Sequence, residues 1–342
     1  MKKHDVIIVG GGPGGLSCAK TLSLAGAKVV LLERKKTVGV KVCAGGITWD
    51  GLIQKVPEKL IERTFNEQYI FSGYQSFCFR KKYPVIATVD RRNLGQWMLD
   101  EAVEVGADIR TGWHVKELGN NLVTATDDMG KTIQLGCDHL VGADGSSSLV
   151  RRFLGIPATL TGIGINYQVP GHYEHMEWHL NTDYFGNGYG WIFPHRQSVS
   201  IGAYGSGKNM PPKLLKKQLI QWALSRGFAL EGEQAGAELI NYDYRGYHFG
   251  TSWLVGDAAG FASGLTGEGI HPALVSGEAV AKKILDPAYP ADEINRLINK
   301  KRQHERLVRI TGHYSTVCTV LMEILTLMIR LKVVDFQKQL SM

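Results

Sequence analysis

The chain has 342 residues, of which 44% are hydrophobic and 21% are charged, which is ample for one large domain or two interleaved ones. The net charge of +7 favours anionic partners, but no recognisable nucleic-acid-binding module appears, so we expect no nucleic-acid partner. The five cysteines form no CxxC pair, which excludes a disulfide framework and favours a reducing compartment. The apolar run near the N-terminus spans only four residues, too few for a signal peptide, so we expect a cytoplasmic protein.

The first 33 residues have the pattern of a strand, a helix and a second strand. Val6–Val9 is wholly apolar, as in a parallel-sheet strand that is buried on both faces. A helix is expected over Pro13–Leu24, stopped by Gly26, and Val29–Leu32 is expected to form the second strand. This strand ends on Glu33, which completes one half of a dinucleotide-binding fold.

A glycine-rich loop, Gly10-x-Gly12-x-x-Gly15, joins the first strand to the helix. Its first glycine permits a tight turn, the second lets a pyrophosphate approach the backbone, and the third lets helix and strand pack closely. The helix N-terminus offers free N–H groups to the phosphates, and Glu33 can accept hydrogen bonds from ribose hydroxyls. The alternative is a glycine turn that binds nothing. We predict a dinucleotide site that contains Gly10, Gly12, Pro13, Gly14, Gly15, Glu33 and Arg34.

The rest of the chain contains further strand and helix patterns. Residues 38–90 look irregular and glycine-rich, whereas Leu94–Val105 predicts a helix. Residues 158–245 alternate apolar and polar residues and are rich in Tyr and Trp, which indicates an antiparallel sheet. Trp253–Asp257 returns to a buried-strand pattern, and a helix is expected over Pro272–Leu285. Short strands are also expected at residues 108–110, 122–127, 132–135 and 139–141.

The order of these elements predicts an α/β (α+β) fold with a discontinuous Rossmann-type domain. We expect residues 1–157 and 246–290 to form the cofactor-binding domain, with residues 40–90 partly on the substrate side. Residues 158–245 would form an inserted antiparallel-sheet substrate domain, and residues 291–342 a helical C-terminal region.

Three further segments separate FAD from NAD as the dinucleotide. Gly142–Arg151 and Val255–Ile270 resemble the second and third fingerprints of the flavoproteins that share the para-hydroxybenzoate hydroxylase fold, and Val89–Leu94 resembles their Arg-containing helix start. By this resemblance Asp257 bonds the ribitol chain, and the backbone around Gly267–Ile270 lies beside the flavin ring. A helix N-terminus there can stabilise the anionic reduced flavin. The resemblance assigns Arg91, Asp144, Gly145, Asp257, Gly267, Gly269 and Ile270 to an FAD site.

Two short segments narrow the family further. Lys41–Gly46 resembles the Lys-x-Cys-Gly-Gly segment of geranylgeranyl reductases, although Ala44 stands where that family usually has Gly. Gly188–Pro194 resembles their Tyr-x-Trp-x-Phe-Pro motif. The resemblance implies that the chain reduces carbon–carbon double bonds of an isoprenoid (prenyl or geranylgeranyl) chain by means of reduced FAD. The prenyl-bearing acceptor is a lipid, a quinone, a pigment or a free prenyl diphosphate.

The same two segments supply the candidate catalytic and substrate-binding residues. By the resemblance Cys43 lies near the flavin as the catalytic candidate, either as proton donor or as substrate wedge; the alternative is a small buried hydrophobic residue. Tyr189, Trp191 and Phe193 share one face of a strand at period two. They would form an aromatic wall for a long apolar substrate, or else pack in a core.

The same sequence features allow two other functions. A flavin monooxygenase (hydroxylase) shares all three fingerprints, and a non-catalytic redox flavoprotein that serves a protein partner is a third class. No second GxGxxG follows a strand, so the external reductant is NAD(P)H that docks transiently or a ferredoxin. The oligomeric state is open.

Two segments look like known sites but lack a required feature. Gly202–Asn209 nearly matches a phosphate-binding P-loop, but it ends in Asn209 rather than Ser or Thr, and Pro211 blocks the helix that should follow. We expect a hairpin turn there. A cluster of three histidines and two acids resembles metal ligands, but its spacing favours a solvated sheet face, and we expect no metal. The cluster contains His172, Glu174, His175, Glu177 and His179.

The basic charge gathers near the C-terminus. Residues 295–342 contain nine Lys/Arg and three acids, and so carry +6 of the net charge of +7. Within them, residues 317–334 are nearly all apolar, with polar residues on one narrow helical stripe. We expect this region to lie peripherally on the inner face of a membrane or on a lipid-bearing partner; the alternative is packing on the core or on a second subunit. The stripe contains Thr319, Glu323, Thr326 and Arg330, whose charges argue against a spanning helix.

Overall fold

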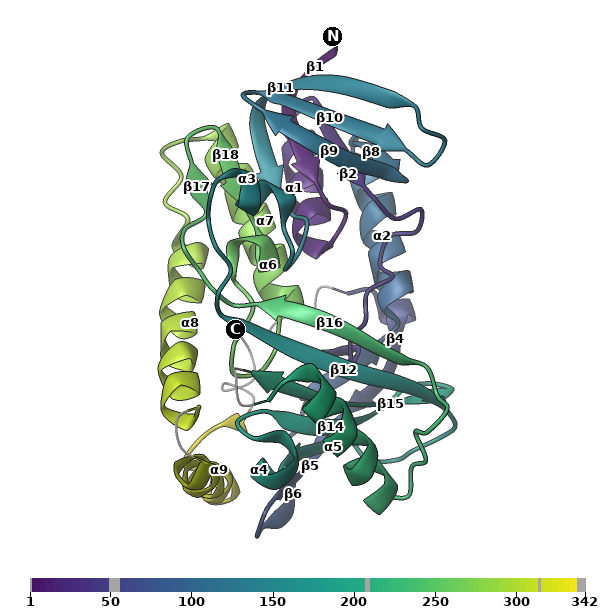
Figure 1. The fold of residues 1–342 in the computed structure, drawn as a ribbon, viewed down its shortest axis with the longest axis vertical. Helices are drawn as coiled ribbons and strands as arrows, with labels where there is room; N and C mark the ends of the chain where they lie inside the picture. Colours follow the sequence, from purple (N-terminus) through teal and green to yellow (C-terminus); the bar gives the residue numbers. More distant parts are fainter. Residues whose placement is uncertain (1, 49–55, 207–209, 313–314, 337–342) are drawn as a thin grey trace.

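The computed structural model describes residues 2–48, 56–206, 210–312 and 315–336 (Figure 1). In Figure 1 one sheet forms the upper part of the molecule and a second sheet the lower part, and helix α8 runs down one side. The predicted α/β fold is confirmed, because a largely parallel sheet with helices against it is joined to a largely antiparallel one.

The upper sheet is built on a parallel core in the order β18-β11-β1-β2-β8. The short strand β17 and the hairpin β9–β10 extend it with antiparallel pairs. Its strands are β1 (Lys2–Val9), β2 (Val29–Glu33), β8 (Asp108–Thr111), β9 (Trp113–Gly119), β10 (Leu122–Asp127), β11 (Thr132–Gly142), β17 (His248–Phe249) and β18 (Ser252–Leu254). Its helices are α1 (Pro13–Leu24), α2 (Arg91–Glu104), α3 (Leu149–Phe153), α6 (Gly256–Ala259) and α7 (Ile270–Leu285).

Residues at the N-termini of α1 and α2 explain where these two helices begin. Pro13 begins α1, as expected of proline in a first turn, where no backbone N–H is needed. Asp90 caps α2 by accepting a hydrogen bond from the backbone N–H of Asn93 at 2.8 Å. The apolar residues of β1 and β2 are almost fully buried beneath these helices, as the all-apolar pattern predicted.

The lower sheet has the order β16-β12-β15-β14-β13-β5-β6. Helices α4 and α5 pack on one of its faces, where Leu215, Leu219 and Trp222 bury against Ile165 and Ile201. Its strands are β5 (Glu67–Ser72), β6 (Ser76–Arg80), β12 (Thr161–Pro170), β13 (Glu177–Leu180), β14 (Tyr189–Pro194), β15 (Ser198–Ser206) and β16 (Ala235–Asn241), and the helices are α4 (Thr182–Phe185) and α5 (Pro212–Ser225). A small third sheet contains β3 (Gly46–Thr48), β4 (Ile61–Phe65) and β7 (Ile86–Val89), preceded by the 3-10 turn η2 (Glu58–Leu60).

The structure differs from the sequence-based elements in several places, among them α5, which was not predicted. The described part of residues 38–90 is not irregular, because it contains five strands, and β5 and β6 complete the lower sheet beside β13. The two strands expected at residues 132–135 and 139–141 are one continuous strand, β11. Helix α2 begins at Arg91 and α7 at Ile270, earlier than predicted, so both N-termini reach the space between the sheets.

Two helices end the described chain, α8 (Asp292–Thr311) and α9 (Ser315–Arg330). Helix α8 packs on α7 in the upper part and leads down to α9, which lies against α4 and β5 of the lower part (Figure 1). Within the described residues, no helix combines the length and apolar character that crossing a bilayer requires.

Candidate functional site

A cavity of about 580 Å³ lies between the two sheets. It extends from the glycine loop before α1 to the aromatic face of β14. Of the residues that the sequence assigned to the cofactor or the substrate, only Gly15 lies outside its lining. The lining contains Gly10, Gly12, Pro13, Gly14, Glu33, Arg34, Cys43, Arg91, Asp144, Gly145, Tyr189, Trp191, Phe193, Asp257, Gly267, Gly269 and Ile270.

Backbone atoms shape the end of the cavity beside α1. Gly10 has a φ of +107°, and a Cβ there would lie 2.4 Å from the carbonyl oxygen of Ala143. A Cβ on Gly15 would lie 2.1 Å from the carbonyl oxygen of Gly10, so this glycine serves the packing of α1 on the loop. A Cβ on Gly12, in contrast, would meet no atom closer than 3.9 Å, which leaves the backbone of Gly12 open to the cavity. Gly10 therefore lies in a tight turn and Gly15 in a close contact between helix and loop, whereas the role of Gly12 toward a pyrophosphate stays a prediction.

Glu33 lies at the end of β2 and is anchored to the glycine loop. One carboxylate oxygen, Oε2, accepts a hydrogen bond from the backbone N–H of Gly11 at 2.6 Å. The other, Oε1, accepts one from the backbone N–H of Lys35 at 2.8 Å. The carboxylate is therefore fixed at the cavity wall, where each oxygen keeps a lone pair for a hydroxyl group.

Three side chains in the lining, those of Thr48, Arg91 and Asp144, have buried polar atoms that lack partners, which indicates a ligand. The Nε and Nη1 atoms of Arg91 are buried without a hydrogen bond, and so is Oδ1 of Asp144. The other oxygen, Oδ2, accepts hydrogen bonds from the N–H groups of Leu149 and Val150 at 2.6 and 3.3 Å. Burial raises the pKa of Asp144. Because orphaned buried groups are costly, this donor and this acceptor fit a bound molecule that carries both anionic and hydroxyl groups, as a dinucleotide does.

Asp257 and Lys41, which both line the cavity, form an ion pair. Oδ2 of Asp257 accepts hydrogen bonds from Nζ of Lys41 at 3.0 Å and from Oγ of Ser146 at 3.2 Å. The charge of Asp257 is the main reason why the pKa of Lys41 is raised. The sequence assigned Asp257 but gave no role to Lys41, although Lys41 opens the segment that contains Cys43.

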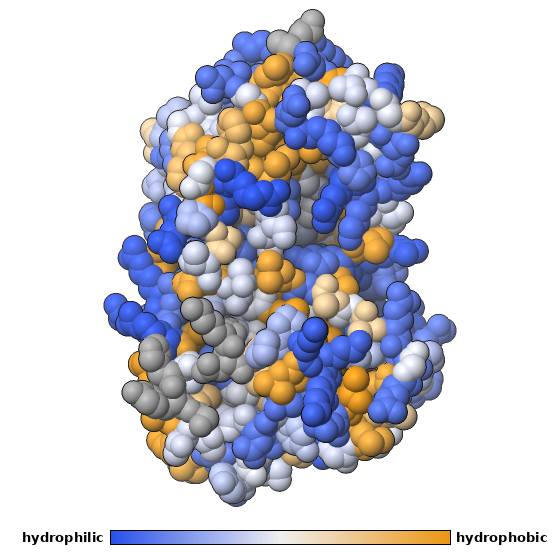
Figure 2. All heavy atoms as spheres, viewed as in Figure 1, coloured by the Kyte–Doolittle hydropathy of each residue, from blue (hydrophilic) through white to orange (hydrophobic). Residues whose placement is uncertain are grey.

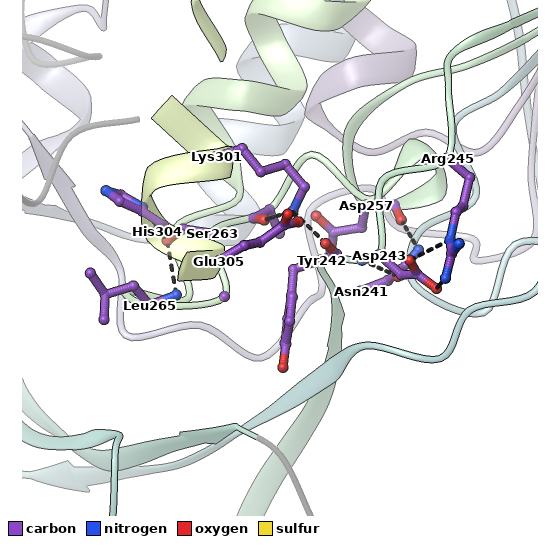
Figure 3. Close-up of polar contacts among 12 residues, drawn as sticks. Asn241, Tyr242, Asp243, Arg245, Asp257, Ser263, Leu265, Lys301, His304 and Glu305 are labelled. Atoms are coloured by element: carbon purple, nitrogen blue, oxygen red, sulfur yellow. Dashed lines mark hydrogen bonds and ion pairs between the residues drawn. The ribbon is translucent and has the colours of Figure 1, made fainter. Parts of the chain in front are cut away.

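The loop that precedes α7 is held from behind by α8 (Figure 3). Oγ of Ser263 accepts hydrogen bonds from the backbone N–H groups of Leu265 and Thr266 at 3.2 and 3.0 Å. Ser263 lies 2.9 Å from Nδ1 of His304, and burial lowers the pKa of His304 to about 4. The neutral imidazole therefore accepts the hydroxyl hydrogen of Ser263. In the same network, buried Lys301 donates to the backbone carbonyls of Tyr242 and Ala262.

Side chains, rather than backbone, shape the other end of the cavity. The ring centroids of Tyr189, Trp191 and Phe193 follow one another at 5.9 and 6.1 Å, as the period of two predicted. Trp178, on the neighbouring strand β13, extends this wall, with its ring 4.8 Å from that of Phe193. The hydroxyl of Tyr189 donates to the carbonyl of Thr266 at 2.6 Å, which connects the wall to the loop before α7.

Cys43 lies between the two ends, on a loop that hydrogen bonds hold from both sides. Its Sγ accepts a hydrogen bond from the N–H of Gly45 at 3.4 Å. On one side Nε2 of His195 lies 3.0 Å from the carbonyl oxygen of Ala44, and Nδ1 lies 2.5 Å from Glu62. The Cys43 side chain is half-buried and lines the cavity.

The other side of the Cys43 loop connects to the aromatic wall. Nε1 of Trp191 donates to Oγ of Ser200 at 3.0 Å, and Ser200 donates to Oδ1 of Asn166 at 2.6 Å. The amide of Asn166 then donates to the carbonyl of Cys43 at 3.5 Å. One chain of hydrogen bonds thus links the wall to the candidate catalytic residue.

The segment with the three histidines differs from its prediction. Glu177 and His179 are 2% and 3% exposed, so they do not form a solvated face. Nε2 of His179 lies 2.8 Å from Oε2 of Glu177, and the other oxygen of Glu177 accepts a hydrogen bond from Tyr173 at 2.6 Å. These side chains satisfy one another's hydrogen-bonding groups on the face of the lower sheet that α5 covers. The P-loop-like segment begins inside β15, and its last residues, 207–209, lie outside the described residues.

Comparisons with known proteins agree with this geometry. The model of the family described as "FAD binding domain" matches residues 3–182. A digeranylgeranylglycerophospholipid reductase of Methanosphaera stadtmanae is 26% identical over 331 residues, which cover 89% of this chain and 84% of that protein. A geranylgeranyl diphosphate reductase of Rhodobacter capsulatus is 27% identical over 319 residues, covering 85% and 78%.

Solved structures show the same fold. A geranylgeranyl bacteriochlorophyll reductase-like protein from Thermoplasma acidophilum superposes with a TM-score of 0.74 at 20% identity, covering 94% of this chain and 87% of that one. A flavin-dependent brominase superposes with a TM-score of 0.69 at 15% identity, covering 94% and 90%. At these identities the likeness concerns the fold alone.

Proposed function

The chain belongs to the FAD binding domain family, and from that premise we propose that it is an FAD-dependent reductase that saturates carbon–carbon double bonds of an isoprenoid chain. The observation that carries the proposal is a continuous cavity whose one end fits a dinucleotide and whose other end is an aromatic wall, with Cys43 between them. The name of one relative supports a prenyl chain borne by a lipid, and that of the other supports a prenyl diphosphate. A quinone or pigment tail has the same chemistry.

Residues at the α1 end would hold the cofactor. Gly12 and the N-terminus of α1 would face the pyrophosphate, Glu33 a ribose, and Asp257 the ribitol chain. The backbone of Gly267–Ile270, at the start of α7, would lie beside the flavin ring, where the helix N-terminus favours negative charge. Arg91 and Asp144 would use their orphaned atoms on the same ligand. When bound, the cofactor supplies a hydride.

The aromatic end would position the substrate. An isolated alkene accepts a hydride poorly, so its alignment and its proton supply must lower the barrier. Tyr189, Trp191, Phe193 and Trp178 would bind the prenyl chain and exclude water from it. One alkene carbon takes the hydride, and the other takes a proton from the thiol of Cys43, which water then reprotonates.

An anaerobic single-turnover experiment tests this function. Dithionite-reduced protein is mixed with a geranylgeranyl lipid, the reoxidation of the flavin is followed by absorbance, and the product is analysed by mass spectrometry. We expect reoxidation without O₂ and a product that gains hydrogen in steps of two. A product that forms only with O₂ and gains oxygen would establish a monooxygenase instead. NAD(P)H and ferredoxin are then compared as reductants in steady-state turnover.

The variant Cys43→Ala tests the role of the thiol in this experiment. We expect reoxidation to slow by about a hundredfold, the lower range for general acid catalysis, with an unchanged flavin content. The matched control is Cys78→Ala, because Cys78 is exposed on β6 and lies outside the cavity lining. A Cys43→Ala protein that reoxidises at the wild-type rate would assign Cys43 to packing.

A further inference from the structure

Helix α9 turns three of the four residues of its polar stripe, Thr319, Glu323 and Thr326, toward the protein. Oγ1 of Thr319 lies 2.6 Å from Oγ1 of Thr182 on α4. Glu323 accepts hydrogen bonds from Ser72 at 2.9 Å and from the side-chain amide of Gln75 at 2.8 Å. The stripe therefore serves as an intramolecular contact, and the residues that reach solvent on α9 are largely apolar.

Five apolar side chains form a continuous row along the outer side of α9, four of them on the helix and the fifth directly after it. They follow one another at spacings of three and four, which places them on one helical face. We name this row the outer apolar stripe. It contains Val317 (39% exposed), Val320 (52%), Ile324 (48%), Leu327 (44%) and Leu331 (63%).

The stripe continues onto neighbouring segments. Val333 is 67% exposed just beyond α9, and Leu307 and Ile310 are 42% and 50% exposed near the end of α8. Figure 2 shows apolar spheres at the lower left, over the position of α9 in Figure 1. A contiguous exposed row of this kind on a soluble domain marks an interaction surface.

The charges around the stripe are positive. The acids among the described residues from 295 to 336 are occupied within the molecule: Glu305 pairs with Lys301, Glu323 faces the β5–β6 turn, and Asp335 pairs with Lys81. Arg306, Arg330 and Lys332, in contrast, are exposed.

The inner side of the same segment packs behind the aromatic wall of the cavity. The ring of Phe336 lies 5.5 Å from that of Trp178, and Ile329 belongs to the same buried cluster as Trp191 and Phe193. The segment that contains α9 thus has the outer apolar stripe on its exposed side and the aromatic end of the cavity on its buried side.

We propose that the outer apolar stripe lies in the surface of an anionic lipid bilayer, as an interfacial helix with its flanking cations on the headgroups. Sixteen residues are too few to span a bilayer, but an apolar helical face with basic neighbours is the arrangement that binds at its interface. A second copy of the chain fits less well, because the one acid of α9 faces inward and would leave the cations of a twin without partners. Binding at the bilayer would bring a lipid-borne prenyl chain close to the cavity, and this consequence rests on the proposed function.

Co-sedimentation of the full-length, FAD-loaded protein with vesicles tests the proposal. Phosphatidylcholine vesicles are compared with vesicles that also contain phosphatidylglycerol, at low and high salt. We expect binding that requires the anionic lipid and falls with salt. The double variant Ile324→Glu/Leu327→Glu should lose at least about tenfold in binding, since two apolar side chains no longer enter the lipid.

A matched control and a charge variant separate the contribution of the apolar side chains from that of the cations. Leu24→Glu/Leu224→Glu makes the same change at two leucines that are each 64% exposed on α1 and α5, and it should bind like wild type. Arg330→Gln/Lys332→Gln should weaken binding to anionic vesicles only. Lack of binding by the wild-type protein would overturn the proposal, and so would a dimer in light scattering that Ile324→Glu/Leu327→Glu dissolves. Anaerobic turnover of a short, water-soluble prenyl substrate, measured without vesicles, tests the proposed function separately.

Discussion

The two ends of the cavity are built by different means. At the α1 end the lining is largely backbone, because Gly10, Gly12 and the N-terminus of α1 form it and Gly15 lets α1 pack closely behind them. At the other end it is side chains, because the rings of Tyr189, Trp191 and Phe193 shape it. An added Cβ at Gly10 or Gly15 would clash with backbone atoms, whereas a side-chain surface can keep its shape when one ring replaces another. We therefore expect substitutions at the two ends to differ both in size and in what they impair.

The largest effect is expected at the backbone end, for Gly15→Ala. Its Cβ would lie 2.1 Å from the carbonyl oxygen of Gly10 and 3.1 Å from Cβ of Ala143, so α1 must move away from the loop. We expect the free energy of unfolding to fall by about 3 kcal/mol, at the upper end for overpacking, and the protein to purify without flavin. Flavin absorbance and denaturant unfolding measure both.

Gly119→Ala is the matched control for this prediction. Its Cβ would meet nothing closer than Cβ of Leu122 at 3.8 Å, at the end of β9, so we expect a change within about 0.5 kcal/mol and normal flavin content. A Gly15→Ala protein that retains flavin as well as this control would show that the backbone end is more adaptable than its packing indicates.

The same contrast explains what the sequence could and could not predict. The glycine loop and α1 follow from signals within a few residues of one another, and the helix forms over the predicted Pro13–Leu24. The aromatic wall depends on the register between two paired strands. Trp178 was missed because spacing within one strand does not show that β13 places it opposite Trp191 on β14. Lys41 was left without a role because its partner Asp257 lies 216 positions further along the chain.

The orientation of α9 could not be predicted from the sequence, for a different reason. Its narrow polar stripe and wide apolar face follow from the sequence, but periodicity does not say which face meets the protein. The structure turns the polar stripe inward because Thr182, Ser72 and Gln75 supply hydrogen-bond partners there.

A second prediction concerns His304, which holds the loop where the two ends meet. Burial lowers its pKa to about 4 in the folded protein, from an ordinary 6.5, so the unfolded chain binds a proton at a pH where the folded protein does not. The resulting stability is present above pH 6.5 and is lost as the pH falls toward 4. We expect the destabilisation of His304→Gln, relative to wild type, to shrink by about 2 kcal/mol between pH 7 and pH 5.

Urea unfolding at both pH values measures this difference. The exposed His172 supplies the control, because His172→Gln removes an imidazole that has no such burial. If the gap between wild type and His304→Gln is independent of pH, the buried imidazole is not the group that titrates, and α8 holds the loop through Lys301 instead.

The smallest effect is expected at the side-chain end, for Trp191→Phe. The substitution keeps a ring in the wall but removes the donor to Ser200, and so breaks the chain of hydrogen bonds that runs through Asn166 to the carbonyl of Cys43. A hydrogen bond of this kind contributes about 0.5–1.5 kcal/mol, so we expect anaerobic flavin reoxidation to slow by about three- to tenfold. Flavin content should not change, because Trp191 lies on the lower sheet, away from the glycine loop.

Trp222→Phe is the matched control. Trp222 is 3% exposed and packs behind the same sheet, outside the cavity lining, so its variant should reoxidise at the wild-type rate. If Trp191→Phe instead loses its flavin, the two ends are one cooperative unit, and the division between backbone and side-chain binding does not hold.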